Sequence, residues 1–188
     1  MSRFVDEAIA RAGLGPVQAA RRAGDVTAVR RLMTEIASVD ILPLGALADA
    51  TRTAEAGDVV RVHPAPAVDV QWVRDGSELD LLRAVAIARI TSPLGARIGV
   101  DWGSSGLEVA QVALGFGASD LTGPITRKSG TLISEDELKK VKGQGMVAAT
   151  ALKRREIAAL VRNAGREPVF TDDTVETSRP EARDARHA

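Results

Sequence analysis

Residues 97–125 have the sequence RIGVDWGSSGLEVAQVALGFGASDLTGPI, and this stretch decides the fold class. Residues 97–102 predict a strand, and residues 106–116 predict a helix that is apolar on most sides. Such a helix is buried under a sheet or other helices rather than facing solvent. Gly117 ends it, and residues 118–125 predict the next strand. A strand, a helix and a strand joined by short glycine-rich turns indicate a βα unit, and hence a parallel sheet.

The neighbouring segments extend this pattern in both directions. Residues 59–62 and 68–73 predict two more strands, and a helix from Ser77 ends before Pro93. A strongly amphipathic helix is expected over residues 152–164. The fold class predicted for the chain is therefore α/β, with a small parallel sheet flanked by helices.

The two ends of the chain differ from this middle part. Helical spacing of apolar residues predicts helices at 5–12, at 26–37 and from about 43 to 56. Residues 172–188 are rich in charge and poor in large apolar groups, which predicts a disordered tail. We therefore expect a single α/β domain over residues 1–171, with a helical N-terminal part at about 1–57.

Composition excludes several classes of function. Among 188 residues, Lys+Arg and Asp+Glu both number 25, so the chain lacks the basic excess of a general nucleic-acid binder. The chain contains no cysteine, which excludes clusters held by thiolates. It contains only 2 histidines, so we do not expect a metal site built from imidazole ligands. Neither a membrane span nor a secretory signal is apparent, so we expect a cytoplasmic protein that binds neither membrane nor nucleic acid.

Four polar or aromatic residues are candidates for ligand contact. His63, Asp101 and Trp102 lie where predicted strands end, which is where parallel α/β proteins hold ligands, and Asp120 lies within the strand predicted at 118–125. Asp101 and Trp102 could accept a ligand hydrogen bond and cover a ring, although a helix N-cap and a core tryptophan are the favoured roles. Asp120 has a similar alternative, with a backbone-bonding turn residue favoured. His63 has no acidic partner nearby in the sequence, which favours a hydrogen-bonded structural residue.

Glycine-containing motifs elsewhere favour structural roles. The stretch GFG at 115–117 ends a helix rather than opening one, unlike a dinucleotide-binding loop. The stretch SEDE at 134–137 is a capping-box pattern, and KKVKGQG at 139–145 predicts a solvated basic loop rather than a phosphate cradle.

Four segments together resemble one group of radical SAM proteins. They are residues 41–50 (ILPLGALADA), 79–89, 106–123 with GASDLTG at its end, and 157–172 with AGREPV. The group contains aminofutalosine synthase, dehypoxanthine futalosine cyclase and the deazaflavin-forming FO synthase. The resemblance implies part of a TIM-type barrel and a place in menaquinone (futalosine route) or related cofactor biosynthesis.

The chain departs from that group at its cofactor site. Members carry a three-cysteine motif for a [4Fe–4S] cluster. This chain instead runs from Val62 through Pro66 to Trp72 and then at once into the helix that begins at Ser77, and it contains no cysteine. Since the radical chemistry belongs to the cluster, we expect no cofactor and no radical catalysis.

Three hypotheses follow. The first is a catalytically degenerate, radical-SAM-like protein that binds a small metabolite or a partner. The second is a non-radical enzyme that uses Asp101 and Asp120 as acid/base groups, which requires a carboxylate with a pKa near neutrality. The third is a structural module that completes another protein's barrel, because four or five parallel strands leave two open edges. A second copy, a full-length radical SAM relative or the helices within residues 5–37 would cover such an edge.

Overall fold

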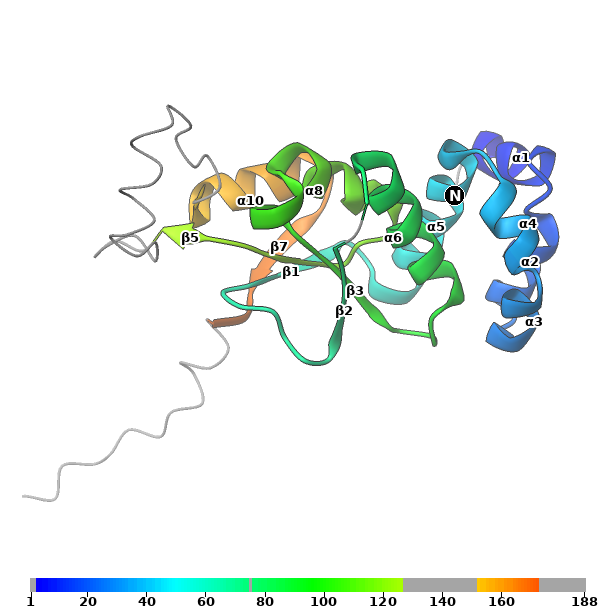
Figure 1. Cartoon of the computed structure of the whole chain (residues 1–188), viewed down its shortest axis with the longest axis horizontal. Coiled ribbons are helices and arrows are strands. Elements are labelled where there is room, and N and C mark those ends of the chain that lie inside the picture. Colours follow the sequence, from blue (N-terminus) through cyan, green and yellow to red (C-terminus); the bar gives the residue numbers. More distant parts are fainter. Residues whose placement is uncertain (1–2, 75, 127–151, 173–188) are drawn as a thin grey trace, which may run out of the picture.

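The computed structural model describes residues 3–74, 76–126 and 152–172. A parallel sheet forms the middle of the molecule, with a layer of helices on one face and a group of short helices at one end (Figure 1). The helices are α1 (Arg3–Arg11), α2 (Gly15–Arg22), α3 (Val26–Arg31), α4 (Met33–Ser38), α5 (Ile41–Ala56), α6 (Glu78–Thr91), α7 (Trp102–Ser105), α8 (Leu107–Ala113), the 3-10 helix η1 (Leu114–Phe116) and α10 (Arg154–Asn163). The strands are β1 (Val59–His63), β2 (Val70–Val73), β3 (Arg97–Asp101), β4 (Asp120–Thr122), β5 (Ile125–Thr126), β6 (Leu152–Lys153) and β7 (Glu167–Phe170).

The main sheet has the strand order β2-β3-β4-β1-β7, and every pair of neighbours is parallel. A separate two-stranded sheet joins β5 to β6. The α/β fold with a small parallel sheet, predicted from the sequence, is therefore confirmed. Asp120 of β4 lies in register with Arg61 of β1 on one side and with Gly99 of β3 on the other.

One face of the sheet is apolar and covered by helices. Alternate strand residues share a face, and those on this face are Val60, Val62, Ile98, Val100 and Leu121, all nearly or fully buried. They form one hydrophobic cluster with apolar side chains of α6, α8 and α10. Figure 1 shows α8 and α10 lying over the sheet on this side. The helix at 107–113 is apolar because it packs against this face of the sheet.

The opposite face of the sheet, which we call the polar face, carries no helix among the described residues (Figure 1). Strands β1 and β2 are parallel and separated by β4 and β3, so the chain must return across the sheet between them. Only residues 64–69 make this return, and both Pro64 and Pro66 favour extended backbone. A six-residue extended segment is too short to form a crossover helix.

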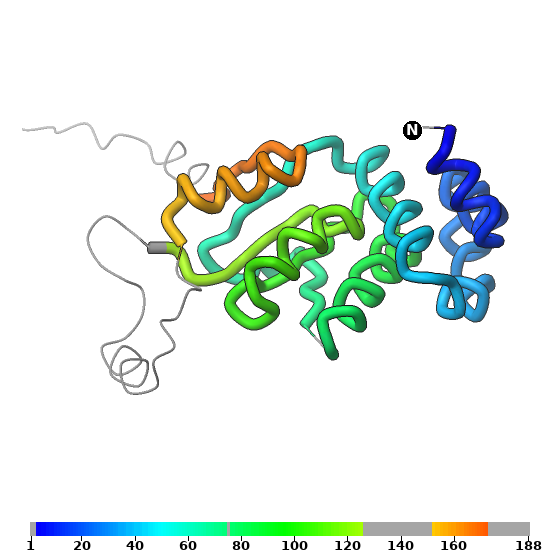
Figure 2. Tube along the Cα trace, turned by 90° about the horizontal axis from the view of Figure 1, so that it is seen from above, coloured from blue at the N-terminus to red at the C-terminus, as the bar shows by residue number. Residues whose placement is uncertain are grey.

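The N-terminal helices form a second core against α5 and α6 (Figure 2). This core contains Ile9, Leu14, Val17, Val29, Ile36, Leu44, Leu47, Ala48, Ala86 and Ile90. The helices lie at one end of the molecule, so the expectation that they cover a sheet edge is wrong. Strands β2 and β7 end the sheet, with no further strand beside either in the described ranges.

Local boundaries differ from the sequence predictions at several points. The helix expected at 26–37 is two short helices that meet at Leu32, and α2 was not expected because Pro16 was interpreted as an interruption. Proline fits the first turn of a helix, where its missing N–H is not needed. The strand expected at 118–125 is divided into β4 and β5 by Gly123 and Pro124.

Some predictions fall outside the described residues. The capping pattern at 134–137, the basic loop at 139–145 and all but the first residue of the tail at 172–188 belong to this group. None of the helices that the structure describes is long and apolar enough to cross a membrane.

Candidate functional site

The polar face brings together two of the four residues selected from the sequence. His63 ends β1 and Asp120 begins β4, and both side chains lie on this face because of the parallel register. The His63 Nε2 atom is 2.7 Å from Asp120 Oδ1. The expectation that His63 lacks an acidic partner is therefore wrong, since its partner stands 57 positions later in the chain.

Asp120 is the centre of a buried hydrogen-bond network. Its Oδ1 accepts from His63 Nε2 and from Arg97 Nε and Nη2, the last at 2.5 Å, and its Oδ2 accepts from Ser119 Oγ at 2.7 Å. The side chain is fully buried. It is thus not the backbone-bonding turn residue that the sequence favoured. Because Asp120 is part of a strand, its side chain lies on the sheet face, where it bonds to other side chains instead of to the backbone.

The network holds Asp120 as a carboxylate. Burial alone would raise the pKa of Asp120, but the hydrogen bonds from His63, Arg97 and Ser119 outweigh burial and lower the pKa below its usual value. For Arg97, burial acts to lower the pKa, but its contacts with Asp120 and Asp69 outweigh burial and raise it. Both groups are therefore charged near neutral pH.

The histidine tautomer follows from these contacts. Arg97 Nη2 lies 2.8 Å from His63 Nε2, but Arg97 can only donate and Asp120 can only accept. Because a bare Nε2 would face the Asp120 oxygen at 2.7 Å, we assign the proton to Nε2, which donates to Asp120. The other ring nitrogen, Nδ1, is 3.3 Å from Thr171 Oγ1. Both nitrogens of His63 are thus occupied within the protein.

Trp72 borders the network on the side of β2. Its ring meets the His63 ring edge to face at 5.7 Å, and its Nε1 donates to the Ala67 carbonyl. A Cβ on Gly99 would lie 2.5 Å from Trp72 Cε3, so the glycine is required for the indole to lie on the sheet. Asp69, just before β2, pairs with Arg97 Nη1 at 2.5 Å. The connection and β2 are thereby tied to the network.

Arg61 is a charged side chain of this central region that the network of described residues leaves unused. It lies in register with Asp120, on the polar face, and is half-buried. No hydrogen bond or ion pair of its guanidinium is present in the part of the chain that the structure describes. The polar face therefore presents a free cation beside a fully bonded carboxylate.

Asp101 and Trp102 take the structural roles that the sequence favoured. Asp101 Oδ1 accepts from the Gly103 N–H at 2.8 Å and caps α7. Trp102 is 1% exposed and belongs to the core on the helix-covered face, packed against Gly123. Asp101 is engaged by the α7 cap and Asp120 has a pKa moved away from neutrality. The geometry therefore does not favour the acid/base hypothesis for this pair.

Sequence reasoning missed Arg97, Ser119, Trp72 and Arg61. Strand alternation was the available indication for three of them, because Arg97 shares the parity of Asp101, and Arg61 that of His63, while Trp72 alternates with Gln71. Which strands lie side by side was not deducible from this pattern. In the described ranges, no group of three or more His, Asp or Glu side chains could hold a metal ion.

Comparison with known proteins gives neither a matching family model nor a matching curated protein.

Proposed function

We propose that the protein is a non-catalytic, radical-SAM-like barrel fragment that binds a small anionic metabolite on its polar face. Its context in this proposal is menaquinone biosynthesis by the futalosine route, or a related cofactor pathway, in the cytoplasm. The observation that carries the proposal is the guanidinium of Arg61, which has no partner among the described residues and lies on a sheet face that carries no described helix.

The strand order is consistent with a barrel origin. In a closed barrel the first and last strands are neighbours, and here β1 lies beside β7, the last described strand of the sheet, with β4, β3 and β2 following on the other side of β1. The direct connection at 64–69 takes the place of the intervening strands of a complete barrel. The polar face then corresponds to the interior of the barrel, and the carboxyl ends of its strands correspond to the edge where such folds place their ligand-contacting side chains.

The charges of this face support anion binding. Arg97 pairs with both Asp120 and Asp69, so its one positive charge offsets one of these two carboxylates. Arg61 adds a second positive charge that has no partner among the described residues, and a guanidinium binds carboxylate or phosphate oxygens in a bidentate manner. Holding a half-buried cation without a partner is unfavourable, and an anionic ligand removes that cost.

The donors of an iron–sulfur cluster do not fit this chain. Thiolate ligands are required, and the sequence contains no cysteine. Asp120 and His63 have every polar atom engaged within the protein, so the described site offers neither a free base nor an activated nucleophile. These contacts support binding without turnover.

Calorimetric titration with adenosine and with its monophosphate, AMP, tests the proposal. These probes differ only in the phosphate, so we expect AMP to bind at least tenfold more tightly than adenosine, as a charge-assisted contact implies. Arg61→Gln should abolish this preference without affecting folding, because the Arg61 guanidinium has no partner among the described residues.

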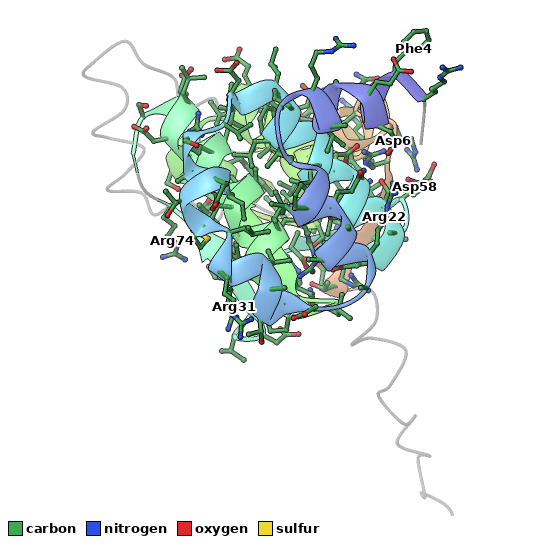
Figure 3. All side chains as sticks on the ribbon, turned by 90° about the vertical axis from the view of Figure 1, so that its right-hand side faces the viewer. Phe4, Asp6, Arg22, Arg31, Asp58 and Arg74 are labelled. Carbon is green, nitrogen blue, oxygen red and sulfur yellow. The ribbon has the colours of Figure 1, made fainter. Side chains whose placement is uncertain are left out.

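Arg31 provides the matched control. It is an exposed arginine that ends α3, at the end of the molecule formed by the N-terminal helices (Figure 3), and Arg31→Gln should leave the AMP preference intact. Equal binding of the two probes by the wild type, or equal effects of the two substitutions, would overturn the proposal.

The open sheet edges favour a second candidate, a module that completes another protein's sheet. Strands β2 and β7 carry no further strand in the described part of the chain. Pro168 lacks an N–H and makes the β7 edge a poor template, which leaves β2 as the edge for a second copy or a full-length relative. Size-exclusion chromatography tests this candidate: a concentration-independent monomer that shows no mass shift with a radical SAM relative speaks against it.

A further inference from the structure

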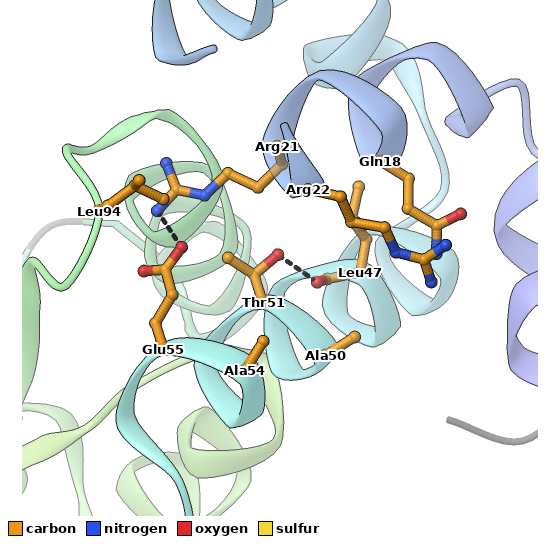
Figure 4. A pocket seen from close by; sticks show the side chains of 9 residues that line it. All are labelled: Gln18, Arg21, Arg22, Leu47, Ala50, Thr51, Ala54, Glu55 and Leu94. Carbon is orange, nitrogen blue, oxygen red and sulfur yellow. Dashed lines mark hydrogen bonds and ion pairs between the residues drawn. The ribbon is translucent and has the colours of Figure 1, made fainter. Parts of the chain in front are cut away.

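A cavity of about 240 Å³ lies between α2 and α5, away from the polar face (Figure 4). Leu47, Ala50 and Ala54 of α5 form one wall, and Leu94 from the turn before β3 closes another side. At roughly 30 Å³ per water in the liquid, this volume equals about eight waters. The cavity is therefore large enough for a small organic molecule.

Arg21 contributes the polar feature of this cavity. Its side chain is 3% exposed and pairs with Glu55 Oε1 at 2.6 Å. Its Nη1 donates to the carbonyls of Ile90 and Ser92. The Nε–H, in contrast, is buried and has no acceptor among the residues that the structure describes. Buried N–H groups are nearly always paired, so this orphan donor beside a cavity indicates an acceptor that comes from outside the chain.

The other polar groups around the cavity are committed elsewhere. Thr51 donates to the Leu47 carbonyl, and Arg22 pairs with Asp6 at 3.0 Å. Glu55 Oε2 accepts from the Gly95 N–H. Gln18 also lines the cavity, and its Nε2 donates to Asp6 Oδ1 at 2.9 Å. Leu47, Ala50, Ala54 and Leu94 make up the rest of the wall, so a lone water on Arg21 Nε would have few further partners. A ligand with an apolar body fits this lining better.

The charge of the ligand follows from Glu55. Its carboxylate already neutralises the Arg21 guanidinium and stands on the adjacent nitrogen. A second carboxylate on Nε would face the Glu55 oxygens at close range and be repelled. We propose that this cavity binds a small neutral molecule with one carbonyl oxygen, which accepts from Arg21 Nε–H while its apolar body packs on Leu47, Ala54 and Leu94.

NMR titration of the full chain with three probes of one size tests this site. Cyclohexanone supplies a carbonyl oxygen, methylenecyclohexane has the same shape without the oxygen, and cyclohexanecarboxylate is anionic. The Nε–Hε signal of Arg21 is the direct readout. We expect it to shift saturably with cyclohexanone, and binding of methylenecyclohexane to be about fivefold to tenfold weaker, as the loss of one hydrogen bond implies.

Ala50→Leu fills the cavity without removing a hydrogen bond and should abolish the shift. Ala159→Leu makes the same change on the exposed side of α10 and should leave it intact. No saturable shift in the wild type, equal affinities for the ketone and the hydrocarbon, or tighter binding of the carboxylate would each overturn the proposal. The titrations of the wild-type chain with the three probes test the proposal even if Ala50→Leu folds poorly.

Discussion

Replacing Asp120 by Asn tests the network on the polar face most stringently, because it removes a charge and keeps the shape. Asn accepts through its Oδ1 but leaves Arg97 without its buried counter-charge. Removing one partner of a buried ion pair costs about 3–5 kcal/mol. Since Arg97 is 23% exposed and keeps Asp69 at 2.5 Å, we expect a loss near the lower limit, about 3 kcal/mol.

Urea and thermal unfolding measure this loss. For a chain of this size, about 3 kcal/mol corresponds to a fall in Tm of roughly 6–12 °C. Asp69→Asn is the control, because Asp69 also pairs with Arg97 but is 63% exposed. An exposed pair contributes at most about 1 kcal/mol. A loss below about 1 kcal/mol for Asp120→Asn, or equal losses for the two variants, would refute the central role of Asp120.

The pH dependence gives an independent test of the same residue. The pKa of Asp120 is lower in the folded protein than its ordinary value of 3.8, so between the two values only the unfolded chain binds the proton. The stabilisation is therefore complete above pH 3.8 and is lost as the pH falls through the folded value. The stability difference between wild type and Asp120→Asn should stay constant above about pH 5 and shrink below about pH 4. A difference that grows in acid contradicts this assignment.

Three further outcomes are expected. Glu55→Gln should reduce the free energy of unfolding in urea by about 3 kcal/mol, because Glu55 contacts the buried Arg21 and Arg89; a loss under about 1 kcal/mol argues against this junction. Gly99→Ala should cost about 1–3 kcal/mol and shift tryptophan emission, because its Cβ would displace Trp72; unchanged emission contradicts the packing described. Reconstitution with iron and sulfide should give neither cluster absorbance nor cleavage of S-adenosylmethionine, and clear cleavage would overturn the non-catalytic assignment.

Much of the fold was predictable because hydrophobic periodicity carries it. Residues 97–122 alternate between a short strand, an apolar helix and a second strand, and the parallel α/β class follows from that order alone. The helix at 26–37 was predicted as one piece because its apolar spacing is continuous across Leu32. The break there lies in the backbone, where tertiary packing overrides the local pattern.

The candidate site was only partly predictable. Residue type and strand-end position selected His63, and residue type alone selected Asp120, but their hydrogen bond depends on β1 lying beside β4. Strand order depends on the whole chain and cannot be predicted from the sequence of either strand alone. Arg97 was missed because it stands at the amino end of its strand, where ligands are not expected, and reaches along the sheet face to Asp120.

The measurement that tests the central claim most directly is paramagnetic broadening of backbone amides by a nitroxide phosphate, phosphonooxy-TEMPO. Bound at Arg61, the nitroxide should broaden amides of β1 and β4 and spare the outer surfaces of α8 and α10, and Arg61→Gln should remove the effect. Broadening confined to the helical layer or to the α2–α5 cavity, or uniform broadening that Arg61→Gln leaves unchanged, would contradict ligand binding on the polar face.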